Sequence, residues 1–254
     1  MARSQGRVPR VYCQQTLAAT NELALSREAS HYLVTVLRSA EGASVRLFNA
    51  IDGEWHCVVS HASRKAARVT CEERLREAEL PPDIDYLFAP LKSARLDYLA
   101  QKATEMGVRR IRPVITRHTV ADKVNLDRVR ANAIEAAEQC NMVYVPDVAE
   151  PEKLKSVLAD WPEDRTLIFC DERAGHENPL DTLKRVKTEA VGVLLGPEGG
   201  FSAEERDLIL SVPNVVALSL GPRIMRADTA AVAVLALVQS VMGDWGTDSS
   251  CTDK

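Results

Sequence analysis

The sequence lacks most of the features that mark membrane proteins, secreted proteins and metalloproteins. Its six cysteines include no C-x-x-C pair and no regular spacing, which argues against a disulfide framework and against a zinc site. The longest apolar run, "AAVAVLALV", is too short to span a bilayer, and "MARSQGRVPR" at the start lacks the apolar core of a signal peptide. We therefore expect a soluble, cytoplasmic protein of a reducing compartment that binds no metal and no membrane.

An overall excess of positive charge, the usual mark of a nucleic-acid binder, is also absent, since the net charge is −4. The charge is uneven, however. Residues 1–70 carry 9 Lys and Arg against 5 Asp and Glu, and residues 90–130 carry 10 against 4. These two basic regions are compatible with an anionic partner, or with charges scattered over solvated surfaces.

The first third of the chain is typical of a small, mostly β domain. Short runs with β-branched residues ("VRLFNA", "WHCVVS", "AARVTCEE") surround a "DG" hairpin signal at 52–53. One helix is expected from Ser26 to Gly42. The prolines of "AELPPD" at 78–83 indicate a linker.

The remaining residues alternate between strands and helices. The expected strands are "IDYLFAP", "RIRPVI", "TLIFCDE", "AVGVLLG" and "VVALSLG", and helical patterns separate them. This alternation predicts an α/β fold with a parallel sheet covered on both faces. We divide the chain into a β domain (1–76), an α/β domain (77–246) and a flexible tail (247–254).

A glycine-rich turn, "LLGPEGGFSAEE" at 194–205, follows one of the buried strands. The helix after it opens with a capping box, Ser202 and Glu205. Ligands bind at the carboxyl ends of strands in such sheets. The turn has neither the lysine of a phosphate loop nor the G-x-G-x-x-G spacing, and Glu198 would repel a phosphate. A cationic or neutral ligand fits better, although a turn that only reverses the chain remains an alternative.

A second turn, in "LSLGPRIMRADTAAVAVLALVQ", repeats the order of strand, Gly-Pro, short loop and helix. Asp228 is the expected N-cap of the last helix. Arg223 and Arg226 precede this apolar helix and are candidates to bind a phosphate, a carboxylate or an oxygen that gains negative charge. The alternative for each arginine is an ion pair with Glu198 or Asp228.

Together, the two turns resemble the motifs of the bacterial 16S ribosomal RNA (uracil-N3)-methyltransferases, a family of the SPOUT (trefoil-knot) superfamily. The segments "RVPRVYC", "HYLVTVLRSAEGASVRLFNAIDGEW", "QKATEMGVRRIRPVITRHTV" and "AIEAAEQC" resemble the same family, so that the likeness covers nearly the whole chain. Three positions depart from the family pattern. Met142 lies where an arginine is common, and Met225 and Asp228 replace a frequent leucine and glutamate.

The resemblance implies a PUA-like β-barrel that binds RNA, followed by a knotted methyltransferase domain. It also implies S-adenosylmethionine as methyl donor, a homodimer, and N3 of a uridine in 16S rRNA as acceptor. A sulfonium donor would explain why an acidic glycine turn is tolerated here. The alternatives are a SPOUT 2′-O-ribose methyltransferase and a non-catalytic RNA-binding assembly factor.

The resemblance also assigns roles to residues. Arg226, and next Arg223, would stabilise the charge that develops on the uracil oxygens, and Glu198 or Asp228 would be the base. Glu138 and Gln139 would orient the uracil. The donor would contact Leu195, Gly196, Pro197, Gly199, Gly200, Leu218, Leu220, Gly221 and Ile224. RNA contacts are expected from Arg7, Arg10, His31, Arg38, Arg64 and Lys65, with further contributions from Arg95, Lys102, Arg117 and Lys123.

Overall fold

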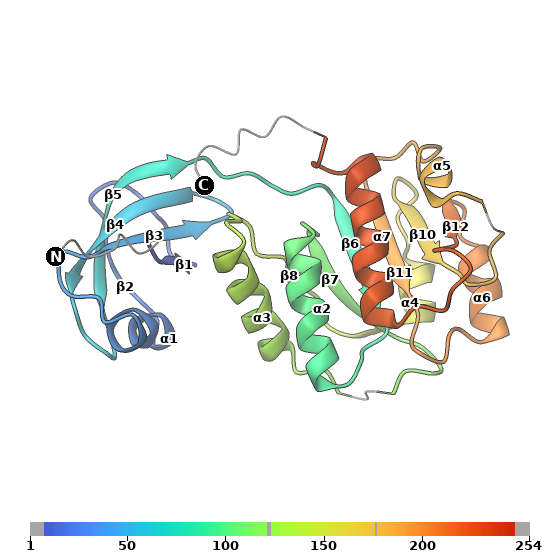
Figure 1. Ribbon diagram of the computed structural model, residues 1–254, viewed down its shortest axis with the longest axis horizontal. Helices are drawn as coiled ribbons and strands as arrows, with labels where there is room; N and C mark the ends of the chain where they lie inside the picture. The colour runs from blue at the N-terminus through green and yellow to red at the C-terminus, as the bar shows by residue number, and fades with distance from the viewer. Residues whose placement is uncertain (1–7, 121–122, 176, 247–254) are drawn as a thin grey trace. The chain divides into compact units, whose positions relative to one another are not determined.

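The computed structural model describes residues 8–120, 123–175 and 177–246 (Figure 1). Arg7 and the tail 247–254 lie outside the described residues. The chain divides into two compact units, Met1–Leu80 with Ala137–Val145, and Pro81–Ala136 with Pro146–Lys254. The division after Leu80 falls within the expected linker "AELPPD", whereas the inclusion of 137–145 in the first unit was not anticipated.

The first unit contains a curled five-stranded sheet in the order β1-β3-β4-β5-β2. β1 and β3 pair in parallel, and the other pairs are antiparallel. Its core consists of aliphatic side chains and cysteines on the inner face. The elements are β1 (Arg10–Tyr12), β2 (Glu22–Ala24), α1 (Arg27–His31), the π-helix η1 (Tyr32–Val36), β3 (Ser44–Asn49), β4 (Gly53–His61) and β5 (Arg68–Arg76).

The hairpin between β3 and β4 forms where the "DG" signal predicted it. Gly53 adopts a φ of +80°, which a side chain rarely tolerates. The Asn49 side chain accepts hydrogen bonds from the backbone N–H groups of Ile51 and Asp52, at 2.9 and 2.6 Å. This Asx geometry closes the turn and sets the register of the two strands.

The helix expected from Ser26 to Gly42 begins as predicted but ends earlier. Ser26 Oγ accepts the N–H of Ala29 at 3.1 Å and caps α1. After His31 the chain widens into η1, and Arg38 then leaves helical geometry with a φ of +56°. Val34, Thr35 and Val36 are β-branched and crowd a regular helix, which is consistent with its early end.

Arg10 lies inside the first unit, and the sequence-based expectation that it contacts RNA is corrected. Its Nε donates to Glu54 Oε1 at 2.6 Å. Its Nη atoms donate to the carbonyl oxygens of Ala137, Glu138 and Met142, at 2.9, 3.0 and 2.7 Å. Only 3% of its side chain is exposed, because β1 directs it toward Glu54 and the end of α3. Arg10 is therefore a structural residue.

Glu54 is shared by a second arginine. Arg76 Nε donates to Glu54 Oε2 at 2.7 Å, and its Nη2 donates to the carbonyl of Asn141 at 2.9 Å. Burial raises the pKa of Glu54, but hydrogen bonds and charges from Arg10 and Arg76 outweigh it, so that the net pKa lies below its ordinary value. The two arginines thus bind carbonyl oxygens at and just after the end of α3, where the helix dipole is negative.

The second unit is built on a parallel sheet, in agreement with the sequence analysis. Seven strands pair in the order β12-β10-β11-β6-β7-β8, with β9 also on β7, and every pair is parallel. The short elements between 147 and 159 were not predicted. The strands are β6 (Ile84–Phe88), β7 (Arg110–Ile115), β8 (Asp147–Val148), β9 (Glu152–Lys153), β10 (Thr166–Cys170), β11 (Val191–Leu195) and β12 (Val215–Leu218).

Helices cover both faces of this sheet, as predicted. Tyr86 and Phe88 belong to a core formed with α2, α3, α5 and α7, whereas Leu87 and Phe169 belong to one formed with α4 and α6. α7 packs against α2, α5 and β11 (Figure 1). The helices are α2 (Ser93–Glu105), α3 (Leu126–Gln139), α4 (Leu154–Ala159), α5 (Pro179–Leu183), α6 (Ala203–Leu210) and α7 (Ala227–Met242). None of the described helices is long and apolar enough to cross a membrane.

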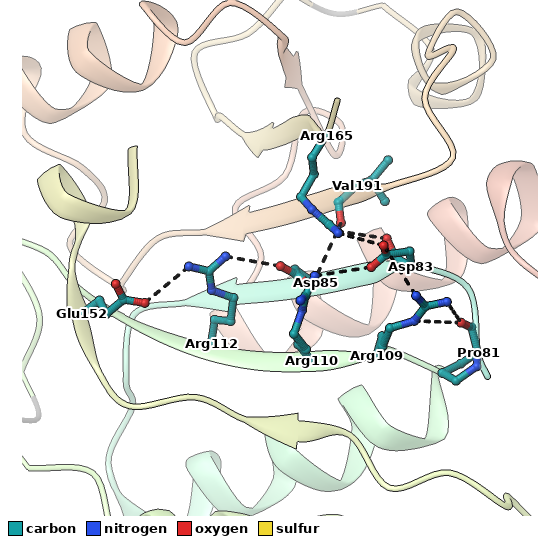
Figure 2. A network of polar contacts seen from close by, with 9 residues as sticks. All are labelled: Pro81, Asp83, Asp85, Arg109, Arg110, Arg112, Glu152, Arg165 and Val191. Carbon is teal, nitrogen blue, oxygen red and sulfur yellow. Dashed lines mark hydrogen bonds and ion pairs between the residues drawn. The ribbon is translucent and has the colours of Figure 1, made fainter. Parts of the chain in front are cut away.

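A charged network joins the amino-terminal ends of the central strands (Figure 2). Asp85 on β6 has only 1% of its side chain exposed. It accepts Nε of Arg110 at 2.6 Å and Nη1 of Arg112 at 3.3 Å, and Nη1 of Arg165 lies 3.6 Å away. Arg165 also donates to the carbonyl of Val191 at 3.0 Å. The network therefore links β6, β7, β11 and the segment before β10, at the edge of the sheet opposite the glycine turns.

Candidate donor-binding site

Three strands of the second unit end side by side. Phe169 of β10 is in register with Leu194 of β11, and Cys170 is in register with Leu218 of β12. Because parallel strands end at the same edge, the loops that follow converge there. They line one cavity of about 390 Å³.

The cavity brings together most of the predicted site residues. All nine residues expected to contact the donor line it, as do Glu198, Arg223 and Arg226. Asp228 and Gln139 are not among the lining residues. The two glycine turns, which are separated by a helix and a strand, thus lie side by side in space.

The first turn, 196–202, is closed by hydrogen bonds and by aromatic packing. The N–H of Gly200 donates to the carbonyl of Pro197 at 2.8 Å, and Gly200 has a φ of +66°. A Cβ at Gly196 would lie 2.6 Å from the Phe201 ring, so this position needs glycine. Phe201 in turn packs edge-on against Phe169, with ring centroids 5.3 Å apart.

The predicted capping box then starts α6. Ser202 Oγ accepts the N–H of Glu205 at 3.2 Å, and Glu205 Oε2 accepts the N–H of Ser202 at 3.0 Å. The position of α6 is thereby fixed directly behind the turn.

The second turn differs from the sequence-based expectation at the start of α7. The N-cap is Arg226 rather than Asp228, which lies in the first turn of the helix, where Oδ1 accepts the N–H of Thr229 at 2.8 Å. The helix begins earlier than expected, so Asp228 interacts with the helix dipole instead of capping it. Gly221 before the loop has a φ of +101°, and Ile224 is almost fully exposed.

The two loop arginines are not neutralised by the acidic residues that the sequence offered as partners. Glu198 instead forms an ion pair with Arg95 of α2. In the part of the chain that the structure describes, neither Arg223 nor Arg226 forms an ion pair. Both are exposed and line the cavity, so their guanidinium groups are available to a ligand.

Sequence reasoning missed the third side of the cavity, which follows β10. Asp171, with 5% of its side chain exposed, accepts Nε of Arg206 at 2.9 Å and the N–H of Arg173 at 3.0 Å. Burial raises the pKa of the Cys170 thiol to about 12, so it is a neutral thiol at pH 7. The signal was present in the sequence, because "TLIFCDE" is a buried strand that ends in charged residues.

The residues named for the uracil are not among those that line the cavity. Glu138 and Gln139 belong to the segment that packs with the first unit, where Glu138 Oε1 accepts the N–H of Tyr12 at 3.0 Å. Glu138 thus has a structural contact that the sequence did not indicate.

Four other residues of the first unit that were expected to contact RNA are exposed. Ser30 Oγ accepts the N–H of Ala67 at 2.9 Å, which joins α1 to the loop between β4 and β5. The candidate RNA contacts that the structure describes as exposed are His31 at the end of α1, Arg38 after η1, and Arg64 and Lys65 in the loop between β4 and β5.

Four basic residues of the second unit were expected to contact RNA, and three of them have acidic neighbours. Arg95 pairs with Glu198, Lys102 with Glu105, and Arg117 with Glu204. Lys123 is exposed. Among the described residues, no group of three or more His, Cys, Asp or Glu side chains could hold a metal ion.

The fold and the cavity together define a two-unit protein with a ligand site at the carboxyl edge of a parallel sheet. The chain belongs to the RNA methyltransferase family, because the family model for the RNA methyltransferase domain matches residues 78–239. The model for the RNA methyltransferase PUA domain matches residues 25–71. The protein is therefore an enzyme of the methyltransferase class.

Individual relatives agree over nearly the whole chain. Ribosomal RNA small subunit methyltransferase E of Rickettsia conorii is 28% identical over 232 residues, which cover 91% of this chain and 94% of the relative. The protein of the same name from Bacillus subtilis is 24% identical, with 89% and 92% covered. The crystal structure of the Neisseria gonorrhoeae enzyme, bound to S-adenosyl methionine, has a TM-score of 0.83 and 25% identity, and covers 94% of this chain and 100% of its own.

Proposed function

We propose that the protein transfers the methyl group of S-adenosylmethionine to N3 of a uridine in 16S rRNA of the small ribosomal subunit. The observation that carries the proposal is that both glycine turns line one cavity, together with two arginines that form no ion pair with any described residue. The names of the relatives and the bound S-adenosyl methionine of the Neisseria protein support the choice of rRNA and of donor.

The cavity has the size and chemistry that the donor requires. Its volume of about 390 Å³ falls in the range of about 300–1,000 Å³ that is typical of small-molecule sites. Leu195, Leu218 and Leu220 offer apolar contacts. In the described part of the chain, the N–H groups of Glu198 and Gly199 donate to no protein acceptor, so both are open to a ligand. A sulfonium donor carries positive charge, which Glu198 attracts. A phosphate carries negative charge, which Glu198 would repel.

When bound, S-adenosylmethionine supplies an electrophilic methyl group, and the protein must provide orientation and charge stabilisation. Removal of the N3 proton places negative charge on the uracil oxygens. Arg226 is the first candidate to stabilise that charge and Arg223 the second, since both line the cavity and neither pairs with an acidic residue in the described ranges. The neutral Cys170 thiol does not favour a thiolate attack on the ring.

Of the two candidate bases, the cavity favours Glu198. Glu198 lines it, whereas Asp228 does not and is held by the first turn of α7. Arg95, the partner of Glu198, is displaceable, because exposed ion pairs contribute at most about 1 kcal/mol.

The proposal extends to the partners and to the place of action. The exposed residues His31, Arg38, Arg64 and Lys65 are suited to phosphate contacts, which would make RNA binding weaken with salt. We also propose a homodimer, a cytoplasmic location with the ribosomal subunit as partner, and the trefoil knot of the SPOUT superfamily. The return of α7 onto β11 and α2 is compatible with such a knot.

Mass spectrometry of nucleosides tests the reaction. The protein is incubated with small subunits that lack the modification and with labelled donor, and the rRNA is then digested. Label in 3-methyluridine is the expected result. Label on ribose would assign a 2′-O-methyltransferase instead, and the absence of label from both rRNA and assembled subunits would indicate a non-catalytic RNA-binding factor.

Two variants test the arginine roles. Removal of one charge-stabilising donor lowers kcat by about 10²–10³ in comparable sites. We expect such a loss for Arg226→Gln, a smaller one for Arg223→Gln, and unchanged donor affinity by calorimetry in both. Full activity of Arg226→Gln would remove this residue from the mechanism. Arg185→Gln, on a surface pair with Glu177, is the control.

A further inference from the structure

His118, in the loop after β7, contacts the glycine turn directly, and the proposed mechanism does not use it. Its Nδ1 lies 3.1 Å from the carbonyl oxygen of Gly200. A carbonyl oxygen can only accept, so Nδ1 carries the proton and donates. His118 Cβ also lies 3.4 Å from the place where a Cβ of Gly199 would be, so the residue packs closely against the turn.

The loop that carries His118 is itself closed by local hydrogen bonds. The N–H of Thr116 donates to Thr119 Oγ1 at 2.8 Å, and the N–H of Thr119 donates to the carbonyl of Thr116 at 3.2 Å. The N–H of Arg117 donates to Glu205 Oε1 at 2.7 Å, the carboxylate that completes the capping box of α6. Two consecutive residues of this loop therefore hold the end of the glycine turn and the beginning of the helix behind it.

The turn needs such support because glycine imposes little conformational preference. Gly199 and Gly200 are adjacent, and Gly200 has a positive φ. With its N–H on Pro197 and its carbonyl on His118, Gly200 has both backbone groups fixed. The open N–H groups of Glu198 and Gly199 lie within the same closed turn. If the Gly200 carbonyl were released, the peptide planes of the turn could rotate, and the amides would have to be ordered again when a ligand binds.

We propose that His118 is a positioning residue for donor binding, which keeps the glycine turn in its binding shape by holding the carbonyl of Gly200. This inference rests on the proposed binding of S-adenosylmethionine in the cavity. His118 is not a catalytic residue, because it does not line the cavity and acts through the backbone of Gly200.

The test compares two substitutions of His118 by calorimetry. His118→Phe keeps a ring of similar size but removes the N–H that donates a hydrogen bond to Gly200. We expect the Kd for S-adenosylmethionine to rise about five- to tenfold, the equivalent of one hydrogen bond. His118→Asn places an amide donor near the position of Nδ1, and we expect it to restore most of the affinity. His61→Phe is the control, because His61 is an exposed histidine of the first unit whose Nδ1 lies 3.3 Å from Glu41.

Two further measurements separate positioning from general stability. The melting temperature without S-adenosylmethionine should fall in His118→Phe by no more than about 4 °C, the size of one lost hydrogen bond. The KM for S-adenosylmethionine should rise while kcat at saturating S-adenosylmethionine stays constant, because the turn is restored once the ligand is bound. Wild-type affinity in His118→Phe, equal losses in Phe and Asn, or a larger fall in the melting temperature would each overturn the proposal.

Failure of this inference is distinguishable from failure of the proposed function. Donor binding is measured without RNA, so methylation of uridine together with normal binding by His118→Phe would refute only the role of His118. Weakened donor binding by His118→Phe without methylation of rRNA would refute only the proposed reaction.

Discussion

Replacement of Glu54 by glutamine should strongly destabilise the first unit. The Glu54 carboxylate is 1% exposed and accepts charge-assisted hydrogen bonds from Arg10 and Arg76 at 2.6 and 2.7 Å. A glutamine keeps the shape and one acceptor oxygen, but it directs an N–H₂ group at one guanidinium and leaves Arg10 buried without a counter-charge. Loss of one partner of a buried pair costs about 3–5 kcal/mol.

The magnitude can be checked against a matched carboxylate on the neighbouring strand. Glu73 of β5 is exposed, and Glu73→Gln should change the free energy of unfolding by less than about 0.5 kcal/mol. Urea unfolding that is monitored by hydrogen exchange of peptides from Gly53–His61 reports on the first unit in particular. If the Glu54→Gln variant unfolded at the same urea concentration as the Glu73→Gln variant, the structural role of the Glu54 carboxylate between Arg10 and Arg76 would be refuted.

The pH dependence of the same difference has a defined sign. The pKa of Glu54 is lowered in the folded state, so its contribution is fully present above the unfolded-state pKa of about 4.3. The contribution is lost as the pH falls through the lower folded-state pKa. Burial lowers the pKa of Arg10 as well, but a guanidinium remains protonated throughout this range. The difference between wild type and Glu54→Gln should therefore be constant near neutral pH and shrink below about pH 4.

Three further predictions concern the second unit. Asp85→Asn should lower its free energy of unfolding by about 3–5 kcal/mol, because Arg110, Arg112 and Arg165 lose a buried partner, whereas Glu152→Gln at the exposed end of the network should have little effect in the same urea titration. Tyr86→Phe should stabilise the unit by about 1–3 kcal/mol in thermal unfolding, because the Tyr86 hydroxyl is buried without a hydrogen-bond partner among the described residues; a loss of stability would show that the hydroxyl has one. Gly196→Ala should weaken donor binding at least about tenfold in calorimetry, since its Cβ would push the Phe201 ring out of place, and Gly175→Ala, where a Cβ has open space, should bind normally.

The features that the sequence predicted well are those with a local physical cause. The alternation of buried strands and helices defined the parallel sheet, and Ser202 with Glu205 marked the start of α6 as it was found. The convergence of the two glycine turns followed from a general property of parallel sheets, namely that the strands end at one edge.

The features that the sequence did not predict depend on contacts between distant residues. Nothing local distinguishes Arg10 from an exposed arginine; its burial requires Glu54 on β4 and the carbonyl groups at 137–142. The wall of the cavity after β10 depends on Arg206 of α6 reaching Asp171. Asp228 was misplaced because Asp is favourable both as a cap and in the first helical turn, so residue type alone does not decide between them.

The pairing of β6 with β11 has a consequence for synthesis of the protein. Ile84 lies beside Val191, so the middle of the large sheet joins segments that leave the ribosome far apart in time. The strands of the first unit all precede residue 77, and they can pair while β6 still has one edge without a neighbour. Such long-range pairing folds slowly. A nascent chain can therefore form the sheet of its first unit before the strands that line the cavity are complete.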